Sequence, residues 1–315
     1  MRSLVKDPNN IRLGIIGMTE GNGHPYSWSA IFNKYDREAM TRECPFPGIP
    51  AYLNLEDRDK MGIPGAHVEC VACDKRSDAE HIAKLSLIPQ VCDKPEEMIG
   101  KVDAVIIATD IGSEHVRRAR PFVEAGLPIF IDKPLCDNRA DLAYFIKLFE
   151  EGYPLLSSSS KRYCKEFVPY HHGNTRELGE LRLIEYGMPK KWETYGIHAL
   201  ESIYPITGPG FGSVRNIGTF ERNIVHLKHK RGIDVIVTGI KDCGGLGLTL
   251  AGTAKNIQLY SGDTYQGFRT QLVKFVEFLR TGERPFPWIE TVELMKLVIA
   301  GIESREQGGK EIPIV

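Results

Sequence analysis

The sequence predicts an α/β protein in which an N-terminal doubly wound parallel sheet precedes a C-terminal α+β domain with a largely antiparallel, open sheet. In the first half, short and continuously apolar segments alternate with helical patterns, as parallel βαβ units require. After residue 160 the segments are mostly strand-like and several alternate apolar with polar residues, which is typical of an antiparallel sheet with one open face. We therefore expect domains at 1–157 and 158–315.

Apolar strands and amphipathic helices alternate through the first half. Continuous apolar runs are expected to be strands buried on both faces: Ile11–Gly17, His67–Cys73, Val102–Thr109, Ile129–Asp132 and, as one more strand of the same sheet, Tyr153–Ser158. The helices expected between them are Ser77–Leu85, Glu114–Ala125 and Asn138–Glu151. Asn138 is a good N-cap residue and Gly152 is a good residue to follow the helix end.

Six strands and two closing helices are expected in the second half. The strands are Leu181–Gly187, Val214–Phe220, Ile224–Lys230, Ile233–Gly239, Leu246–Gly252 and Asn256–Tyr260. Arg231–Gly232 is a plausible hairpin turn. One helix carries an apolar face from Phe268 to Leu279 and ends at Gly282, and the other runs from about Ile289 to Ser304. Since an open sheet face must be covered, we expect a homodimer or homotetramer through this sheet.

Composition excludes several classes of function. The chain has 315 residues, of which 42% are apolar, and its 40 basic and 41 acidic residues give a net charge of −1. This balance gives no electrostatic case for nucleic-acid binding. No apolar stretch approaches the roughly 18 residues that span a bilayer, and the start MRSLVKDPNN has no signal-peptide core. A cytoplasmic protein that binds neither membrane nor nucleic acid is expected.

Seven scattered cysteines, an odd number, do not form a disulfide framework. Cys70 and Cys73 form a C-x-x-C motif, but they lie in a predicted strand and no second pair follows at zinc spacing. We therefore expect no metal site.

A glycine-rich turn, Gly17-Met-Thr-Glu-Gly21-Asn-Gly23, connects the first strand to a helical pattern over Tyr26–Tyr35. A strand, a glycine-rich turn and a helix begin the Rossmann dinucleotide-binding fold, in which N–H groups at the helix start receive the pyrophosphate. Thr19 stands where the second glycine of the G-x-G-x-x-G motif belongs. Either Gly21 and Gly23 do this work in a longer loop, or phosphate binding is loosened, and a plain glycine-rich turn is the alternative.

An acidic residue at the end of the second strand would bind the adenosine ribose, and Asp74 occupies that position. The other interpretation of Asp74 is a turn residue or helix cap. Lys75 and Arg76 follow and could accept a 2′-phosphate, so the cofactor is NAD or NADP. Asp74 lies far beyond the usual 20 residues after the glycines. Residues from about Asp36 to Ala66 therefore form an insertion, and its many Pro and Gly residues predict an irregular loop.

Three segments of the chain, at 102–138, at 192–210 and from Gly282 onward, resemble the Gfo/Idh/MocA family of glucose–fructose oxidoreductase and inositol dehydrogenase relatives. Asp132-Lys133-Pro134, after a buried strand, matches the family's Glu-Lys-Pro. Upstream, Ala108, Thr109 and His115 keep part of the family's A-T-P-N-x-x-H pattern. Downstream, WETYGIHALESIYPITGPG resembles the family's second active-site segment, with His198 at the catalytic position. The C-terminal segment from Gly282 also resembles the family's last helix and tail, so the resemblance covers nearly the whole chain.

The resemblance implies an NAD(P)-dependent oxidoreductase that transfers a hydride between nicotinamide and a secondary alcohol or ketone of a sugar, cyclitol or related polyol. The implied catalytic residues are Lys133 and His198. The implied cofactor-binding residues are Gly17, Thr19, Asp74, Thr109, His115, Asp132, Lys133 and Pro134. The implied substrate-binding residues are Lys133, Arg162, Thr194, Tyr195 and His198. The family's usual Asp four residues before the histidine is Thr194 here, with Glu193 beside it.

Elementary chemistry supports these roles. A lysine at the carboxyl end of a parallel strand lies in the crevice where such sheets bind ligands, and its ammonium group can stabilise a developing alkoxide. The alternative is a surface lysine, as expected for Lys94 in Asp93-Lys94-Pro95, which follows no clear buried strand. An imidazole in general titrates near neutral pH, so His198 could move a proton, or it is a structural histidine on a helix that packs under the sheet. The alternative function is a non-catalytic ligand-binding or regulatory protein that retains the fold.

Overall fold

The computed structural model describes residues 2–315, and their contacts divide them into two compact units. The first comprises the residues up to Asp132 together with Tyr144–Ser157 and Phe268–Phe286. The second comprises Lys133–Ala143, Ser158–Gly267 and Pro287–Val315. The chain therefore passes from one unit to the other between Asp132 and Lys133, inside the motif that the sequence singled out.

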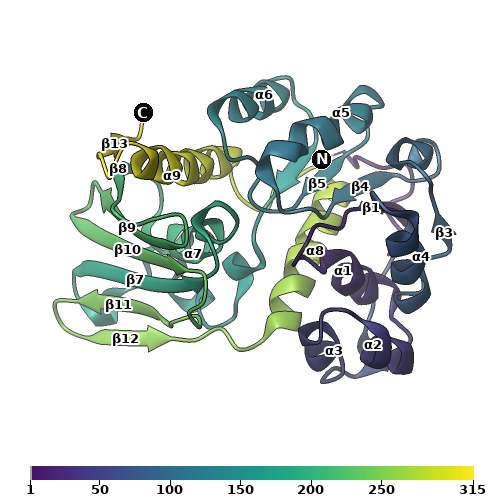
Figure 1. Cartoon of the computed structure of the whole chain (residues 1–315), viewed down its shortest axis with the longest axis horizontal. Helices are drawn as coiled ribbons and strands as arrows, with labels where there is room; N and C mark the ends of the chain where they lie inside the picture. The colour runs from purple at the N-terminus through teal and green to yellow at the C-terminus, as the bar shows by residue number, and fades with distance from the viewer. Residues whose placement is uncertain (1) are drawn as a thin grey trace. The chain divides into compact units, whose positions relative to one another are not determined.

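The first unit contains a six-stranded, wholly parallel sheet in the order β3-β2-β1-β4-β5-β6 (Figure 1). The strands are β1 (Ile11–Ile16), β2 (Ala66–Ala72), β3 (Gln90–Val91), β4 (Ala104–Ile107), β5 (Ile129–Ile131) and β6 (Leu155–Ser157). The doubly wound sheet is as predicted, and its strands are apolar because both faces are buried. Strand β3 was not predicted, because two residues at a sheet edge form no recognisable pattern.

Helices cover this sheet, and one of them, α6, has the capping residues that the sequence predicts at both ends. The helices that the sequence predicts are α1 (His24–Asn33), α4 (Arg76–Leu85), α5 (His115–Glu124), α6 (Arg139–Glu150) and α8 (Thr264–Thr281). Asn138 Oδ1 accepts the N–H of Asp141 at 2.9 Å, and Gly152 has a φ of 77° after α6. On α8, Phe275 contacts Phe130 of β5 with ring centroids 5.4 Å apart.

The insertion at residues 36–66 is mostly helical, so the expectation of an irregular loop was wrong. It forms α2 (Arg37–Glu43), α3 (Gly48–Leu53) and a 3₁₀ turn at Arg58–Lys60. Asp36 Oδ1 accepts the N–H of Ala39 at 3.0 Å and so caps α2. The prolines misled the prediction because Pro47 and Pro50 lie before and within the first turn of α3, where helices tolerate a missing N–H.

The second unit contains a seven-stranded sheet in the order β12-β11-β7-β10-β9-β8-β13 (Figure 1). Its strands are β7 (Leu181–Pro189), β8 (Phe211–Asn216), β9 (Arg222–His229), β10 (Ile233–Ile240), β11 (Leu248–Gly252), β12 (Asn256–Leu259) and β13 (Ile312–Pro313). Only β7 and β10 pair in parallel, which confirms the largely antiparallel sheet. Gly232 has a φ of 73° between β9 and β10, at the predicted turn.

Helices α7 (Trp192–Thr207) and α9 (Trp288–Glu306) cover one face of this sheet. Along β10 the inward Ile233, Val235 and Val237 are buried, whereas Asp234 is exposed and Ile236 is partly exposed on the other face. None of the helices in residues 2–315 combines the length and the apolar character that a membrane crossing needs. All seven cysteines are free thiols.

An indole ring fixes α7 against α9. The fully buried Trp192 of α7 donates its Nε1–H to the carbonyl oxygen of Val298 at 2.9 Å. Gly196 and Gly301 leave room for the ring, since a Cβ on Gly301 would lie 2.4 Å from Nε1 and one on Gly196 would lie 2.5 Å from Cε3. The position of α7, and of every side chain it carries, therefore depends on these two glycines.

Gly301→Ala should destabilise the protein. The added Cβ forces Trp192 to move, and we expect a net loss of roughly 1–3 kcal/mol even though alanine favours the helix. Urea unfolding measures the change. Gly48→Ala in α3 is the matched control, because a Cβ there meets nothing within 4 Å. Equal unfolding midpoints for the two variants would contradict this packing account.

Candidate active site

The loop after β1 approaches the end of β4 closely. Gly17 has a φ of 144°, and a Cβ there would lie 3.2 Å from the backbone of Ala108, so this position needs glycine. Gly21 has a φ of 77°. Gly23 serves packing, since a Cβ there would meet Phe46 at 2.5 Å. Thr19, at the position of the missing glycine, donates its hydroxyl to a carboxylate oxygen of Asp110 at 2.6 Å.

The N–H groups at the start of α1 are already engaged. His24 donates its backbone N–H to Asn22 Oδ1 at 2.9 Å, and Pro25 has none. Tyr26 and Ser27 both donate to the carbonyl oxygen of Gly23, at 3.1 and 3.3 Å. Within residues 2–315, the backbone N–H groups of Met18, Glu20 and Gly21 have no acceptor. The longer loop, and not the helix start, therefore has the donors that a pyrophosphate needs.

Asp74 lies at the carboxyl end of β2, beside that loop. Ala72 pairs with Ile16 at the end of β1, so the two strands end side by side. The Asp74 carboxylate receives both Nη groups of Arg118, at 2.9 and 2.8 Å, and these hydrogen bonds lower its pKa. Arg118 is buried in α5 and also pairs with Glu114 at 2.7 Å. A carboxylate that is ionised and fixed in this way can accept ribose hydroxyls.

Arg118 and Glu114 were missed by the sequence analysis, although their i, i+4 spacing on a helix was a usable signal. Arg76, considered as a 2′-phosphate contact, pairs with Glu80 at 2.8 Å and with Asp93.

Three further predicted residues lie where β4 and β5 end. His115 donates its Nε2–H to the carbonyl oxygen of Thr109 at 3.0 Å, so the structure brings these two together. Asp132 is completely buried after β5. Its Oδ2 accepts Nδ1–H of His24 at 2.7 Å and Nδ2–H of Asn22 at 3.3 Å, which ties the loop after β1 to the end of β5. Pro134 follows Lys133 through a cis peptide bond.

The second unit brings Lys133, Tyr195 and His198 together. The Lys133 ammonium lies 5.8 Å from the centre of the Tyr195 ring, and that ring is 4.9 Å from the His198 imidazole. Lys133 and His198 are only 3% and 8% exposed. The sequence analysis did not single out Ser159, whose Oγ lies 2.6 Å from His198 Nδ1. A buried ammonium group and an imidazole that both lie near one aromatic ring can bind a polar oxygen and exchange its proton.

Arg162 lies in the same interior but faces carboxylates. Its Nε pairs with Glu201, and its Nη1 pairs with Glu290 at 2.8 Å. Burial raises the pKa of Glu201, and the charge of Arg162 opposes that shift. Thr194 is half-buried in the first turn of α7, next to Glu193, which pairs with Arg305. The structure thus links Arg162 to the His198 side of α7 through Glu201.

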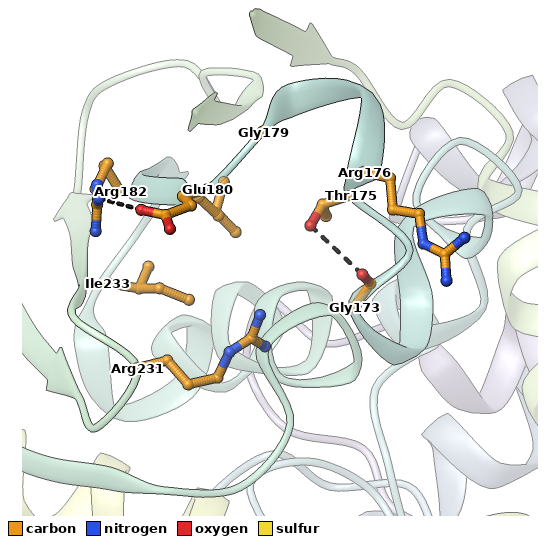
Figure 2. A pocket seen from close by; sticks show the side chains of 9 residues that line it. Gly173, Thr175, Arg176, Gly179, Glu180, Arg182, Arg231 and Ile233 are labelled. Atoms are coloured by element: carbon orange, nitrogen blue, oxygen red, sulfur yellow. Dashed lines mark hydrogen bonds and ion pairs between the residues drawn. The ribbon is translucent and has the colours of Figure 1, made fainter. Parts of the chain in front are cut away.

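A separate cavity of about 520 Å³ opens beside the starts of β7 and β10, and three arginines line it (Figure 2). Arg182 pairs there with Glu180, and Arg231 donates to the carbonyl oxygen of Thr207 at 3.2 Å. None of the predicted site residues lines this cavity. Residues 2–315 hold no cluster of three or more His, Cys, Asp or Glu side chains that could bind a metal ion.

Comparisons with known proteins agree with this geometry. Residues 11–156 match the model of the Gfo/Idh/MocA oxidoreductase family with an NAD-binding Rossmann fold. No curated protein matches the sequence.

Three solved inositol dehydrogenases share the fold of the chain. A myo-inositol dehydrogenase from Lactobacillus casei, in complex with NAD(H) and myo-inositol, is 13% identical with a TM-score of 0.73 over 97% of each chain. A myo-inositol 2-dehydrogenase from Lactobacillus plantarum is 14% identical with a TM-score of 0.73, over 97% of this chain and 100% of its own. The enzyme from Corynebacterium glutamicum is 15% identical with a TM-score of 0.71, over 97% and 99%. At such identities the likeness shows the fold alone.

Sheet order, the loop after β1 and the matched segment agree on one assignment. Residues 11–156 match the NAD-binding Rossmann domain of the Gfo/Idh/MocA oxidoreductase family, and their six-stranded parallel sheet has the fold that this match implies.

Proposed function

We propose that the protein is an NAD(P)-dependent dehydrogenase that interconverts a secondary alcohol and a ketone of a sugar, cyclitol or related polyol. The observation that carries this proposal is the cluster of Lys133, Tyr195 and His198. In it, a buried ammonium group and a histidine ring lie near the same tyrosine ring. The bound nicotinamide would supply or accept the hydride. The complex of the Lactobacillus casei enzyme with NAD(H) and myo-inositol supports the polyol class.

Each residue of the cluster has a chemical role in this proposal. Lys133 donates a hydrogen bond to the substrate oxygen and stabilises the alkoxide character that develops there. His198 exchanges the proton of that oxygen. Tyr195, which lies near both, contacts the substrate together with Thr194. Arg162 supports the same side of α7 through Glu201.

The first unit would hold the cofactor. The loop from Gly17 would bind the pyrophosphate through its backbone N–H groups, with Thr19 oriented by Asp110. Thr109, His115, Asp132 and the adjoining Lys133-Pro134 would border the nicotinamide. Asp74 would accept the ribose hydroxyls. Because Asp74 is anionic and Arg76 is engaged with two carboxylates, this arrangement favours NAD over NADP.

NADH should bind more tightly than NADPH, with micromolar affinity, in a calorimetric titration of the purified protein. Asp74→Ala should weaken NADH binding roughly tenfold, since it removes charge-assisted hydrogen bonds to the ribose. Glu124→Ala, at an exposed position at the end of α5, is the control and should bind normally. If neither reduced cofactor binds, the cofactor role of the first unit is wrong.

Lys133→Met should lower turnover by about 10²–10³-fold, as expected when a donor to a developing oxyanion is removed, and leave NADH affinity nearly unchanged. The measurement is NAD⁺ reduction with a panel of polyols that includes myo-inositol. Lys94→Met is the matched control, because Asp93-Lys94-Pro95 has the same three letters and Lys94 is exposed. Full activity in the Lys133 variant would refute its role.

A second candidate is a non-catalytic binding or regulatory protein that retained the fold. Two observations favour it: the N–H groups at the start of α1 are engaged, and Thr194 replaces the family's aspartate. Cofactor binding without turnover on any polyol or ketone would support this candidate.

We also propose a cytoplasmic homodimer or homotetramer that assembles through the open face of the second sheet. Free thiols at all seven cysteines support the reducing compartment. On the open face, Ile224 of β9 is 43% exposed and pairs with Thr238 of β10. Ile236 and Ile240 lie two residues before and two residues after Thr238, so they point to the same face. His226 and Asp234 form an ion pair across this face at 2.7 Å. An apolar centre with charged groups beside it suits a self-complementary interface.

Ile236→Glu should convert the assembly to single chains of 35.3 kDa in sedimentation velocity, since a charge opposite Glu185 and within the interface is costly. Leu55→Glu, at a residue that is 83% exposed in the first unit, should not change the mass. A wild-type protein that is already a monomer would contradict the proposed assembly.

A further inference from the structure

Lys190 is placed beside the ring of Tyr195 by an unusual backbone conformation. It lies between Pro189, the last residue of β7, and Lys191, which precedes α7. Its φ is 64°, in the left-handed region that glycine adopts freely and other residues rarely adopt. Its ammonium nitrogen lies 4.6 Å from the centre of the Tyr195 ring. The turn into α7 therefore directs this side chain toward a residue of the proposed substrate site.

The contact with Tyr195 does not by itself account for a lysine at this position. A left-handed conformation costs a residue with a Cβ more free energy than one exposed cation–π contact contributes. Lys190 is exposed, and glycine would fit the same turn without strain. Backbone strain that nearby contacts do not offset is typical of positions that serve a function.

The Lys190 ammonium is not neutralised by a neighbouring carboxylate. Within residues 2–315 it has no ion-pair or hydrogen-bond partner. Glu193, the carboxylate nearest in sequence, is paired with Arg305. Lys133, whose ammonium lies 5.8 Å from the centre of the same ring, has a further interaction of its own. The positive charge that remains available beside Tyr195 is therefore that of Lys190.

We infer that the substrate carries a negatively charged group, a carboxylate or a phosphate, which binds Lys190 while the reacting oxygen lies in the cluster of Lys133, Tyr195 and His198. This inference rests on the proposed function and narrows its substrate class from polyols in general to acidic sugars and acidic cyclitols. Because both ammonium groups lie near one ring, a single sugar-sized molecule can reach both. Lys190 is thus a specificity-determining residue.

An ammonium group suits this role. It is a compact charge with three rotatable donors, and it binds carboxylate and phosphate oxygens without the planar fork by which arginine selects a bidentate partner. Because Lys190 is exposed, dissolved salt screens its attraction for an anion. The affinity for an acidic ligand should therefore fall as the ionic strength rises, whereas the affinity for a neutral ligand should not.

Calorimetric titration of the protein in excess NADH tests the inference without turnover. The ligands are two matched pairs, methyl glucoside with methyl glucuronide and myo-inositol with myo-inositol 1-phosphate, which separate the carboxylate from the phosphate. We expect the acidic member of at least one pair to bind about tenfold more tightly than its neutral partner, as a charge-assisted contact provides. Equal affinities within both pairs, or no binding of either acidic member, overturns the inference.

Variants show whether Lys190 recognises the charge. Lys190→Met should remove the preference for the acidic member, and Lys190→Arg should keep it because the positive charge remains. Lys190→Gly should also lack the preference and should fold normally, since glycine adopts a φ of 64° without strain. Lys191→Met is the matched control: it removes the same charge one residue away, where the ammonium lies 5.5 Å from the Phe220 ring, and should keep the preference. A preference that survives in Lys190→Met overturns the inference.

Turnover separates this inference from the proposed function. Preferential binding of an acidic ligand without any NAD⁺ reduction would refute the proposed catalysis and leave the recognition of charge by Lys190 standing. NAD⁺ reduction with neutral polyols alone would support the proposed catalysis and overturn the inference.

Discussion

Parallel pairing of β1 with β2 and β4 is the constraint on which the first unit depends. Because these strands run in the same direction, their carboxyl ends lie along one edge of the sheet. That edge collects the loop from Gly17, Asp74 after β2 and Thr109 after β4, although the sequence separates them by many residues. Asp132 after β5 completes the edge, and its hydrogen bonds to Asn22 and His24 close it. The chemistry of the unit follows from strand direction.

Helix α7 has the corresponding role in the second unit. Trp192 fixes it against α9, and a helical spacing of three then presents Tyr195, His198 and Glu201 on one face. Packing and side-chain placement are therefore coupled in this helix, because the glycines that accept the indole ring also determine where the imidazole lies. His198 on this face also contacts a hydroxyl group, Ser159 Oγ, at 2.6 Å from its Nδ1.

The sequence was most informative where burial imposes a pattern. Strands β1, β2, β4, β5 and β6 were predictable because both their faces are covered, and the Asp-Lys-Pro motif was recognisable because it follows such a strand. The helices at 36–66 were not, because proline at a helix start and proline in a loop look alike in composition. Partners that are distant in sequence were also missed, such as Arg118 for Asp74, 44 residues away, and Ser159 for His198, 39 residues away. Neither pair has a local pattern, since only the folded chain brings its members together.

Transfer of deuterium tests the central claim most directly. The protein is mixed with NADH that carries deuterium at both positions of the nicotinamide C4 and with a panel of cyclitol and sugar ketones, and the masses of the products are measured by mass spectrometry. A dehydrogenase of the proposed kind should place one deuterium on the new carbinol carbon of at least one ketone product. The Lys133→Met protein should transfer none. Retention of the label on the cofactor with every ketone, despite tight NADH binding, would contradict it and favour a binding or regulatory role.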